Sequence, residues 1–188
     1  MDRKHRNCRT KRNSVSIRSR WLKKEQPSGT NDINASEYLV EIKPKVIEQL
    51  KNYSQHNGNE QCGILMGSQI DEKTFRISKV SPPCVAHNSK CGCERDAQKA
   101  NDFIRKDYEE SKHTRVYVGE WHTHPEPNPT PSPTDISSII SNYNSALLAV
   151  PFLMMIIVGT GSLYCSVYNG NNFVVMSNID NSILKNIL

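Results

Sequence analysis

Two histidines separated by a single residue, His122 and His124, constrain the fold of this chain more than any other feature. In an extended strand the side chains alternate between two faces, so both imidazoles lie on the same face. Asp135 follows beyond a proline-rich loop and can return to the same place. Two histidines and one carboxylate are a common ligand set for a catalytic zinc, which keeps its fourth position for water. The sequence therefore predicts a strand and a loop that bring these three side chains to one Zn2+ ion, a site typical of hydrolases.

The hydrophobic patterns elsewhere predict a mixed α/β fold. Apolar runs between turn signals indicate strands at 38–43, 62–70, 74–81, 115–121, 152–158, 163–168 and 173–176. Helical spacing indicates helices at 44–58 and 94–111, and a third helix from Asp135 onward with Thr134 as its N-cap. The segment between Pro82 and Cys93 is expected to be a loop. The sum is an α/β sandwich of a mixed sheet and flanking helices.

The positive charge is concentrated at the N-terminus. Residues 1–24 hold ten Lys or Arg and one acid, a balance of +9, whereas residues 25–188 hold fourteen bases and eighteen acids, a balance of −4. Residues 1–35 are expected to form a disordered basic arm and linker, and residues 36–188 the folded domain. The arm is either a solvated extension or a weak contact for nucleic acid, anionic lipid or an acidic partner. Nucleic-acid binding is not expected as the main activity.

The sequence shows no feature of export or membrane insertion. The arm lacks the apolar stretch of about 7–15 residues that a secretory signal needs. The longest apolar run, 146–158, is too short to cross a bilayer about 30 Å thick and contains Pro151. A cytoplasmic location without membrane contact is therefore expected.

Six cysteines are too few and too irregularly spaced for a disulfide framework. Cys84, Cys91 and Cys93 cluster with His87 in one segment, so a second, structural zinc is one interpretation. The Cys-x-x-Cys spacing of such sites is absent, and Cys-x-Cys is a poorer chelate. A redox-labile pair and ordinary loop thiols are the other two interpretations.

The residues that surround the two histidines form a more specific pattern than the pair alone. The stretch from His122 to Asp135 reads HTHPEPNPTPSPTD, with Ser132 three residues before the aspartate. This pattern resembles the JAMM signature of the MPN/JAB-domain metalloproteases. The signature also includes a glutamate just before a Gly-Ile-Leu-x-Gly strand, and Glu60 precedes such a strand here. The resemblance covers about residues 37–177 and implies the MPN/JAB sandwich, a cytidine-deaminase-like fold with a curved mixed sheet flanked by helices.

The resemblance implies a role for each residue of the motif. His122, His124 and Asp135 would bind one Zn2+ ion, whose charge makes a water molecule acidic near neutral pH. Glu60 would act as general base and then return the proton to the leaving amine. Ser132 would stabilise the oxyanion of the tetrahedral intermediate, a contribution of about 2.7–4 kcal/mol in comparable enzymes. The residues alone leave open that Glu60 is a solvated linker residue and Ser132 only a turn residue.

Glu120 is a departure from the family pattern, because many members have an aromatic residue at this place. It shares strand parity with His122 and His124, so it could rival Glu60 as base or orient an imidazole N–H. Thr123 points to the opposite face and is expected to be a packing residue. The Gly-Glu-Trp sequence is similar to a bacterial branch of small JAB proteins found beside E1- and E2-like enzymes in anti-phage operons.

The resemblance implies a zinc isopeptidase. Its substrate would be the amide between the C-terminus of a ubiquitin-like modifier, or another E1-activated protein, and a target amine, and its partners would be those conjugates and the E1/E2-like proteins of its operon. One alternative is maturation, the trimming of a ubiquitin-like or sulfur-carrier precursor. The other alternative is a scaffold, since some MPN domains bind no metal and only hold partners together.

Overall fold

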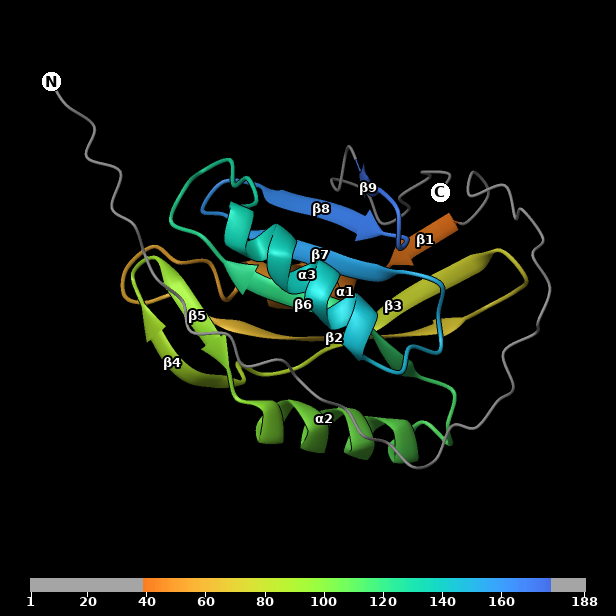
Figure 1. The fold of residues 1–188 in the computed structure, drawn as a ribbon. Helices are drawn as coiled ribbons and strands as arrows, with labels where there is room; N and C mark the ends of the chain where they lie inside the picture. Colours follow the sequence, from red (N-terminus) through yellow and green to blue (C-terminus); the bar gives the residue numbers. More distant parts are fainter. Residues whose placement is uncertain (1–38, 177–188) are drawn as a thin grey trace, which may run out of the picture.

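The computed structural model describes residues 39–176, which form a curved seven-stranded mixed sheet with helices on both faces and a separate two-stranded hairpin (Figure 1). The arm and linker predicted for residues 1–35, and the domain boundary at residue 36, lie outside the described residues. Among the described residues, no helix is long and apolar enough to cross a membrane.

The elements follow one another with short connections. In chain order they are β1 (Leu39–Ile42), α1 (Pro44–Lys51), β2 (Cys62–Gln69), β3 (Thr74–Val80), β4 (Val85–Ser89), β5 (Gly92–Arg95), α2 (Ala97–Glu110), β6 (Val116–Thr123), α3 (Pro133–Ser145), β7 (Leu153–Val158), β8 (Leu163–Tyr168) and β9 (Phe173–Val175). The large sheet has the order β1-β3-β2-β6-β7-β8-β9, and β4 pairs with β5 alone. The β1–β3 and β6–β7 pairs are parallel and the others antiparallel. The predicted α/β fold with a mixed sheet is confirmed.

The strand β7 shows how the two faces of the sheet are covered. All six of its residues are buried, as expected of a strand between two layers. Met154, Ile156 and Val158 belong to one apolar cluster, which includes two residues of α1. Leu153 and Ile157 belong to the other, which includes residues of α2 and α3. The helix α1 therefore covers one face, and α2 and α3 cover the other (Figure 1).

An irregularity in β6 decides which of its side chains share a face. The β2–β6 register shifts between Leu65 and Met66, so that Leu65 pairs with Gly119 and Met66 with Tyr117. Because the shift breaks the alternation, Tyr117 and Glu120 point to the same face and bond to each other. Beyond the shift the alternation is regular, and it carries Glu120 and His122 to the face of α2 and α3.

Two predicted helix boundaries and one predicted loop are wrong. The first helix ends at Lys51, not near Gly58, and the chain then turns. The helix α2 begins at Ala97, not Glu94, because Asp96 is its N-cap. The Asp96 side chain accepts hydrogen bonds from the backbone N–H groups of Gln98 and Lys99. The segment between Pro82 and Cys93 is not a plain loop, since most of it forms the β4–β5 hairpin.

The helix α2 carries a buried carboxylate that the apolar pattern did not reveal. Asp107 is only 1% exposed. It accepts hydrogen bonds from Lys79 of β3 at 2.5 Å and from two nitrogens of Arg115 at 2.7 and 2.9 Å. These charges tie α2 to the sheet at the end remote from β4 and β5.

We expect Asp107→Ala to lower the free energy of unfolding by about 2–3 kcal/mol. Loss of one partner of a fully buried pair costs about 3–5 kcal/mol, but Lys79 and Arg115 are partly exposed to water and recover some solvation. Urea unfolding measures the change. Asp102→Ala, which removes an exposed pair with Arg105, is the matched control and should change stability by less than about 1 kcal/mol. Equal effects of the two substitutions would contradict this account.

The same carboxylate makes stability depend on pH. Burial by itself would raise the pKa of Asp107, but the hydrogen bonds and charges of Arg115 and Lys79 outweigh it and hold the pKa below its ordinary value of 3.8. A carboxylate with a depressed pKa stabilises the fold above its unfolded-state pKa, and the contribution is lost as the pH falls through the lower folded-state value. The Asp107 contribution should therefore be complete at neutral pH and disappear only below about pH 4.

Candidate metal centre

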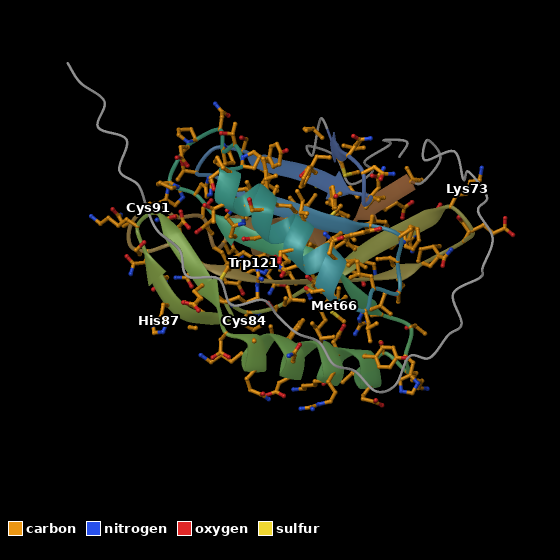
Figure 2. The ribbon with its side chains drawn as sticks, in the orientation of Figure 1. Met66, Lys73, Cys84, His87, Cys91 and Trp121 are labelled. Carbon is orange, nitrogen blue, oxygen red and sulfur yellow. The ribbon has the colours of Figure 1, made fainter. Side chains whose placement is uncertain are left out.

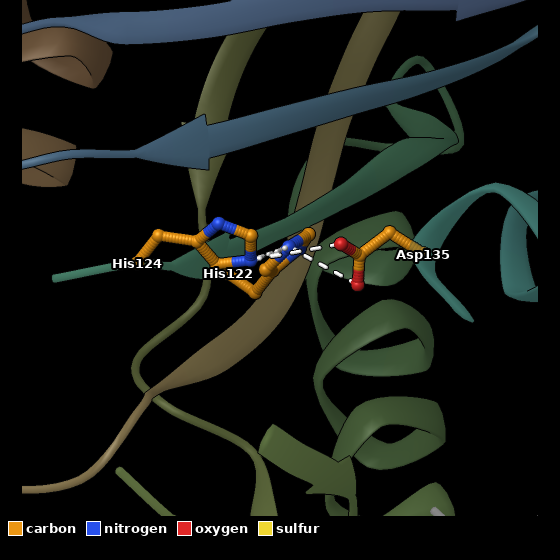
Figure 3. A group of neighbouring side chains, drawn as sticks. All are labelled: His122, His124 and Asp135. Carbon is orange, nitrogen blue, oxygen red and sulfur yellow. Dashed lines mark hydrogen bonds and ion pairs between the residues drawn. The ribbon is translucent and has the colours of Figure 1, made fainter. Parts of the chain in front are cut away.

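The three side chains predicted to bind a metal meet at the end of β6 (Figure 3). His122 is the last but one residue of β6, His124 follows the strand directly, and Asp135 lies in the first turn of α3. Their ligand atoms all lie within 4.8 Å of one another. All three side chains are partly buried. The structure therefore brings these three predicted residues together.

The distances between these atoms fit one tetrahedral ion. The two histidine Nε2 atoms are 3.2 Å apart. His122 Nε2 lies 3.4 Å from Asp135 Oδ1, and His124 Nε2 lies 3.6 Å from Asp135 Oδ2. Ligands about 2.0–2.1 Å from a tetrahedral zinc are about 3.3–3.4 Å from each other. Three protein ligands, one fewer than a structural zinc takes, are the pattern of catalytic sites.

The helix start fixes the position of Asp135. Ser132, not the predicted Thr134, is the N-cap of α3: its hydroxyl accepts a hydrogen bond from the Asp135 N–H at 3.2 Å. In return the Ser132 N–H donates to Asp135 Oδ2 at 2.7 Å, which completes a capping box. Pro133 occupies the first turn, where its missing N–H costs nothing. The cap uses a lone pair of the Ser132 hydroxyl, and a hydrogen bond between this hydroxyl and the Asp135 carboxylate helps to lower the pKa of Asp135.

The charges of the site favour an ionised aspartate. Burial alone would raise the pKa of Asp135, but hydrogen bonds from His122, His124 and Ser132 hold it well below its usual range. Burial alone would likewise lower the pKa of His124, yet its hydrogen bond to Asp135 raises it. Asp135 is therefore charged at neutral pH, as a metal ligand must be.

The loop between His124 and Asp135 is held by the β7–β8 turn, a contact that the sequence did not indicate. Thr160 N–H donates to the Glu126 carbonyl at 3.0 Å, and the Ser162 N–H and hydroxyl both donate to the Pro127 carbonyl, at 2.8 and 3.1 Å. His124 N–H donates to the Val158 carbonyl at 3.0 Å. The prolines restrict the loop, but these bonds determine where it lies.

Gly159 allows the loop between His124 and Asp135 to approach the β7–β8 turn closely. A Cβ atom at Gly159 would lie 2.5 Å from Pro129 Cδ and 2.6 Å from the Glu126 carbonyl oxygen. We expect Gly159→Ala to displace the loop and lower the affinity of the site for a metal ion by about 10–100-fold, the range seen when groups that orient metal ligands are lost. Competition with a chelator measures it. Gly161→Ala, whose Cβ would approach no atom closer than 3.0 Å, should have a smaller effect, and equal affinities would contradict the account.

Glu60 lies beside the cluster although it comes from another part of the chain. Cys62 pairs with His122 in the β2–β6 ladder, and the same register continued by two residues places Glu60 opposite His124. Residues directly opposite each other in an antiparallel pair point to the same face. Its side chain is thus directed to the face that carries the two imidazoles.

The environment of Glu60 raises its pKa. Glu60 is buried, with only 6% of its surface exposed. Burial raises its pKa to about 7, while the positive charge of His124 opposes the shift and the negative charges of Asp135 and Glu126 add to it. Glu60 is therefore not a solvated linker residue, and a carboxyl group with such a pKa can both accept and release a proton near neutral pH.

Glu120 was predicted to rival Glu60 as base or to orient an imidazole N–H, and its contacts in the structure fit neither role. Glu120 is 4% exposed, and its Oε1 accepts hydrogen bonds from Arg95 at 2.7 Å, Tyr117 at 2.9 Å and Asn142 at 3.0 Å. Three donors on one oxygen leave it poorly suited as a mobile base, and the imidazoles are not among these donors. Its function here is to pair with the buried Arg95 and to connect β5, β6 and α3.

The cysteine segment does not form a second metal centre. Within residues 39–176, His122, His124 and Asp135 are the one group of three or more His, Cys, Asp or Glu side chains close enough to hold an ion. Cys84, His87 and Cys91 lie at different places along the hairpin and its base (Figure 2). Cys93 instead faces Cys62, and the hydrogen bond between these thiols lowers the pKa of Cys62 and raises that of Cys93.

Thr123 is more than a packing residue. It is fully buried, as predicted. Its hydroxyl oxygen accepts a hydrogen bond from the Gln61 N–H at 2.9 Å and donates to Gln55 Oε1 at 3.3 Å. Thr123 therefore joins the strand of the histidines to the residue that follows Glu60.

Comparison with known proteins identifies the class. Residues 45–173 match the family described as prokaryotic homologs of the JAB domain, and the chain belongs to this family. A solution structure of a protein from Desulfitobacterium hafniense has the same fold, with a TM-score of 0.56 and 19% identity over 78% of this chain and 95% of that one.

Two curated relatives make the class narrower. A protein of Vibrio cholerae serotype O1 is 32% identical over 121 residues, which cover 61% of this chain and 78% of that protein. A protein of Escherichia coli is 32% identical over 132 residues, which cover 66% of this chain and 79% of that protein. Both are named CD-NTase/cGAS isopeptidase. The family and these relatives together identify the chain as a JAB-domain hydrolase of the bacterial deconjugase type.

Proposed function

We propose that this chain is a zinc-dependent isopeptidase. It hydrolyses the amide bond between the C-terminus of a ubiquitin-like or other E1-activated protein and a target amine. The observation that carries the proposal is the placing of His122, His124 and Asp135 at distances that fit one tetrahedral ion, with the buried carboxyl of Glu60 beside them. The names of the two curated relatives support the choice of an isopeptide bond.

The residues around the site divide the reaction among them. His122, His124 and Asp135 would hold the ion, which would supply Lewis-acid chemistry: a polarised amide carbonyl and a water molecule made acidic near pH 7. Glu60 accepts the proton of the attacking water and then delivers it to the nitrogen of the leaving amine. The hydroxyl of Ser132, whose O–H can rotate from Asp135 toward the substrate, stabilises the negative charge that develops on the carbonyl oxygen.

The names of the two relatives support a substrate class. We propose that the protein released is a CD-NTase or cGAS-like protein, or a ubiquitin-like modifier. We further propose that E1- and E2-like proteins of the same operon make the conjugates. Maturation of a ubiquitin-like or sulfur-carrier precursor is the alternative within the same chemistry. The filled ligand set and the buried Glu60 argue against a non-catalytic scaffold.

Three substrates separate these functions. The first is a conjugate that joins the C-terminus of a CD-NTase from the same genome to a lysine side chain. The second has ubiquitin in place of the CD-NTase, and the third is a precursor with extra residues after its C-terminal glycine. We expect the zinc-loaded protein to cleave the first at the highest kcat/KM. Cleavage of the precursor alone would favour maturation, and no cleavage of any of them would refute the isopeptidase.

A further inference from the structure

Glu60 lies just before the β2–β6 ladder, because β2 begins at Cys62. The β4–β5 hairpin binds the backbone of Glu60 itself. The Glu60 N–H donates to the Ser89 carbonyl at 2.8 Å, and the Glu60 carbonyl accepts a hydrogen bond from Asn88 Nδ2 at 2.7 Å. Both backbone polar groups of Glu60 are thus bound by two consecutive residues of β4.

The peptide group between Glu60 and Gln61 is fixed from two sides. Its carbonyl is bound by the Asn88 side chain, and its N–H donates to Thr123 Oγ1 at 2.9 Å. Thr123 lies between His122 and His124, so this second bond connects the peptide group to the strand that carries the histidines. Since the peptide group is planar, two such bonds set its orientation, and with it the direction in which the Glu60 side chain leaves the backbone.

The Asn88 side chain is not required by the hairpin itself. Asn88 pairs with Cys93 in the β4–β5 ladder, which uses backbone groups. The Asn88 backbone carbonyl and side-chain Oδ1 also accept long, exposed hydrogen bonds from Asn59 Nδ2, at 3.3 and 3.4 Å. The side-chain amide bond to Glu60 can therefore be removed while the ladder stays intact.

We propose that Asn88 is a positioning residue for Glu60: its amide holds the peptide plane from which the Glu60 carboxylate reaches the metal centre. This inference rests on the proposed function of Glu60 as general base. A catalytic group displaced by about 1 Å can cost about 10²-fold in rate, so a single hydrogen bond at this place has a large kinetic effect. The hairpin and the base are thereby coupled.

Two substitutions at Asn88 test the proposal. Asn88→Ala removes the donor, and Asn88→Asp keeps the shape but directs a carboxylate oxygen at the Glu60 carbonyl, so it should not rescue. For both we expect kcat on the CD-NTase–lysine conjugate to fall by about 10–100-fold, with KM within about 3-fold of wild type and one zinc ion retained per chain. Asn59→Ala removes the two exposed contacts with Asn88, at 3.3 and 3.4 Å, but no bond of Glu60. It is the control and should keep kcat within about 2-fold, because the 2.7 Å bond from Asn88 to Glu60 remains.

A second measurement does not depend on activity. Hydrogen exchange of the Glu60 amide, followed by NMR, should be faster by at least about 10-fold in Asn88→Ala and unchanged in Asn59→Ala. Wild-type kcat in both Asn88 variants, or wild-type exchange of this amide in Asn88→Ala, would overturn the inference. An equal loss in Asn59→Ala would overturn it as well, since Asn88 would then only dock the hairpin. If the wild-type protein cleaves nothing, the proposed function fails, and the exchange rates alone decide whether Asn88 holds Glu60.

Discussion

Replacement of Glu60 by glutamine is expected to lower kcat for isopeptide hydrolysis by about 10²–10⁴-fold while one zinc ion stays bound per chain. Glutamine keeps the size and the hydrogen-bonding shape of the side chain but cannot accept a proton from water. Burial raises the pKa of Glu60 to about 7, and a carboxyl group with such a pKa can release the proton again. Steady-state cleavage of the conjugate, together with elemental analysis for zinc, measures both parts of the prediction.

The control for this variant is Glu126→Gln. Glu126 also lies close to His124, with Oε2 3.5 Å from Nδ1, but its side chain is 58% exposed. Its loss removes a neighbouring negative charge without removing the base, and we expect kcat to fall by less than about 10-fold. Full activity of the zinc-loaded Glu60→Gln protein would contradict the assignment of the base.

Replacement of Asp135 by asparagine is expected to lower the zinc affinity by more than about 100-fold, beyond the 10–100-fold typical of residues that only orient a ligand. The loss removes the one negative charge of the ligand set. The amide oxygen of asparagine can still accept the Ser132 N–H, so the capping box keeps its geometry and α3 should persist. Chelator competition gives the affinity, and circular dichroism shows whether the helix is retained.

Ser132→Ala tests the roles of Ser132 as helix cap and oxyanion donor separately from zinc binding by Asp135. It removes the hydroxyl that accepts from the Asp135 N–H, which should destabilise the fold by about 1 kcal/mol. We expect this variant to retain zinc and to lose kcat by about 10²–10³-fold because the donor to the oxyanion is gone.

For the Asp135→Asn variant, a wild-type zinc affinity would show that Asp135 is not a ligand.

Much of the site could be predicted because its spacing follows from backbone geometry. His122 and His124 share a face for the simple reason that strands alternate, and the structure brings Asp135 to them as expected. The cap was also readable, since Ser132, Pro133 and Asp135 form the Ser-x-x-acid pattern that begins helices. Thr134, the N-cap predicted from the sequence, instead lies within the first turn of α3.

Other parts could not be predicted because they depend on contacts between distant segments. No local pattern links Ser162 to the Pro127 carbonyl or requires a glycine at Gly159. The β4–β5 hairpin has polar, half-exposed strands, so it lacks the alternation that reveals a strand. The partners of Glu120 depend on a register shift in β6, which moves Tyr117 to the same face, and a single sequence does not indicate where such a shift occurs.

The dependence of cleavage on zinc tests the central claim most directly. The protein is stripped of metal with a chelator, dialysed, and assayed on the CD-NTase–lysine conjugate before and after one equivalent of Zn2+ is added. We expect the stripped protein to be inactive, and activity to return in proportion to zinc up to one ion per chain, with no recovery in Asp135→Asn at the same zinc concentration. Undiminished cleavage by the stripped protein would contradict a zinc isopeptidase built on His122, His124 and Asp135.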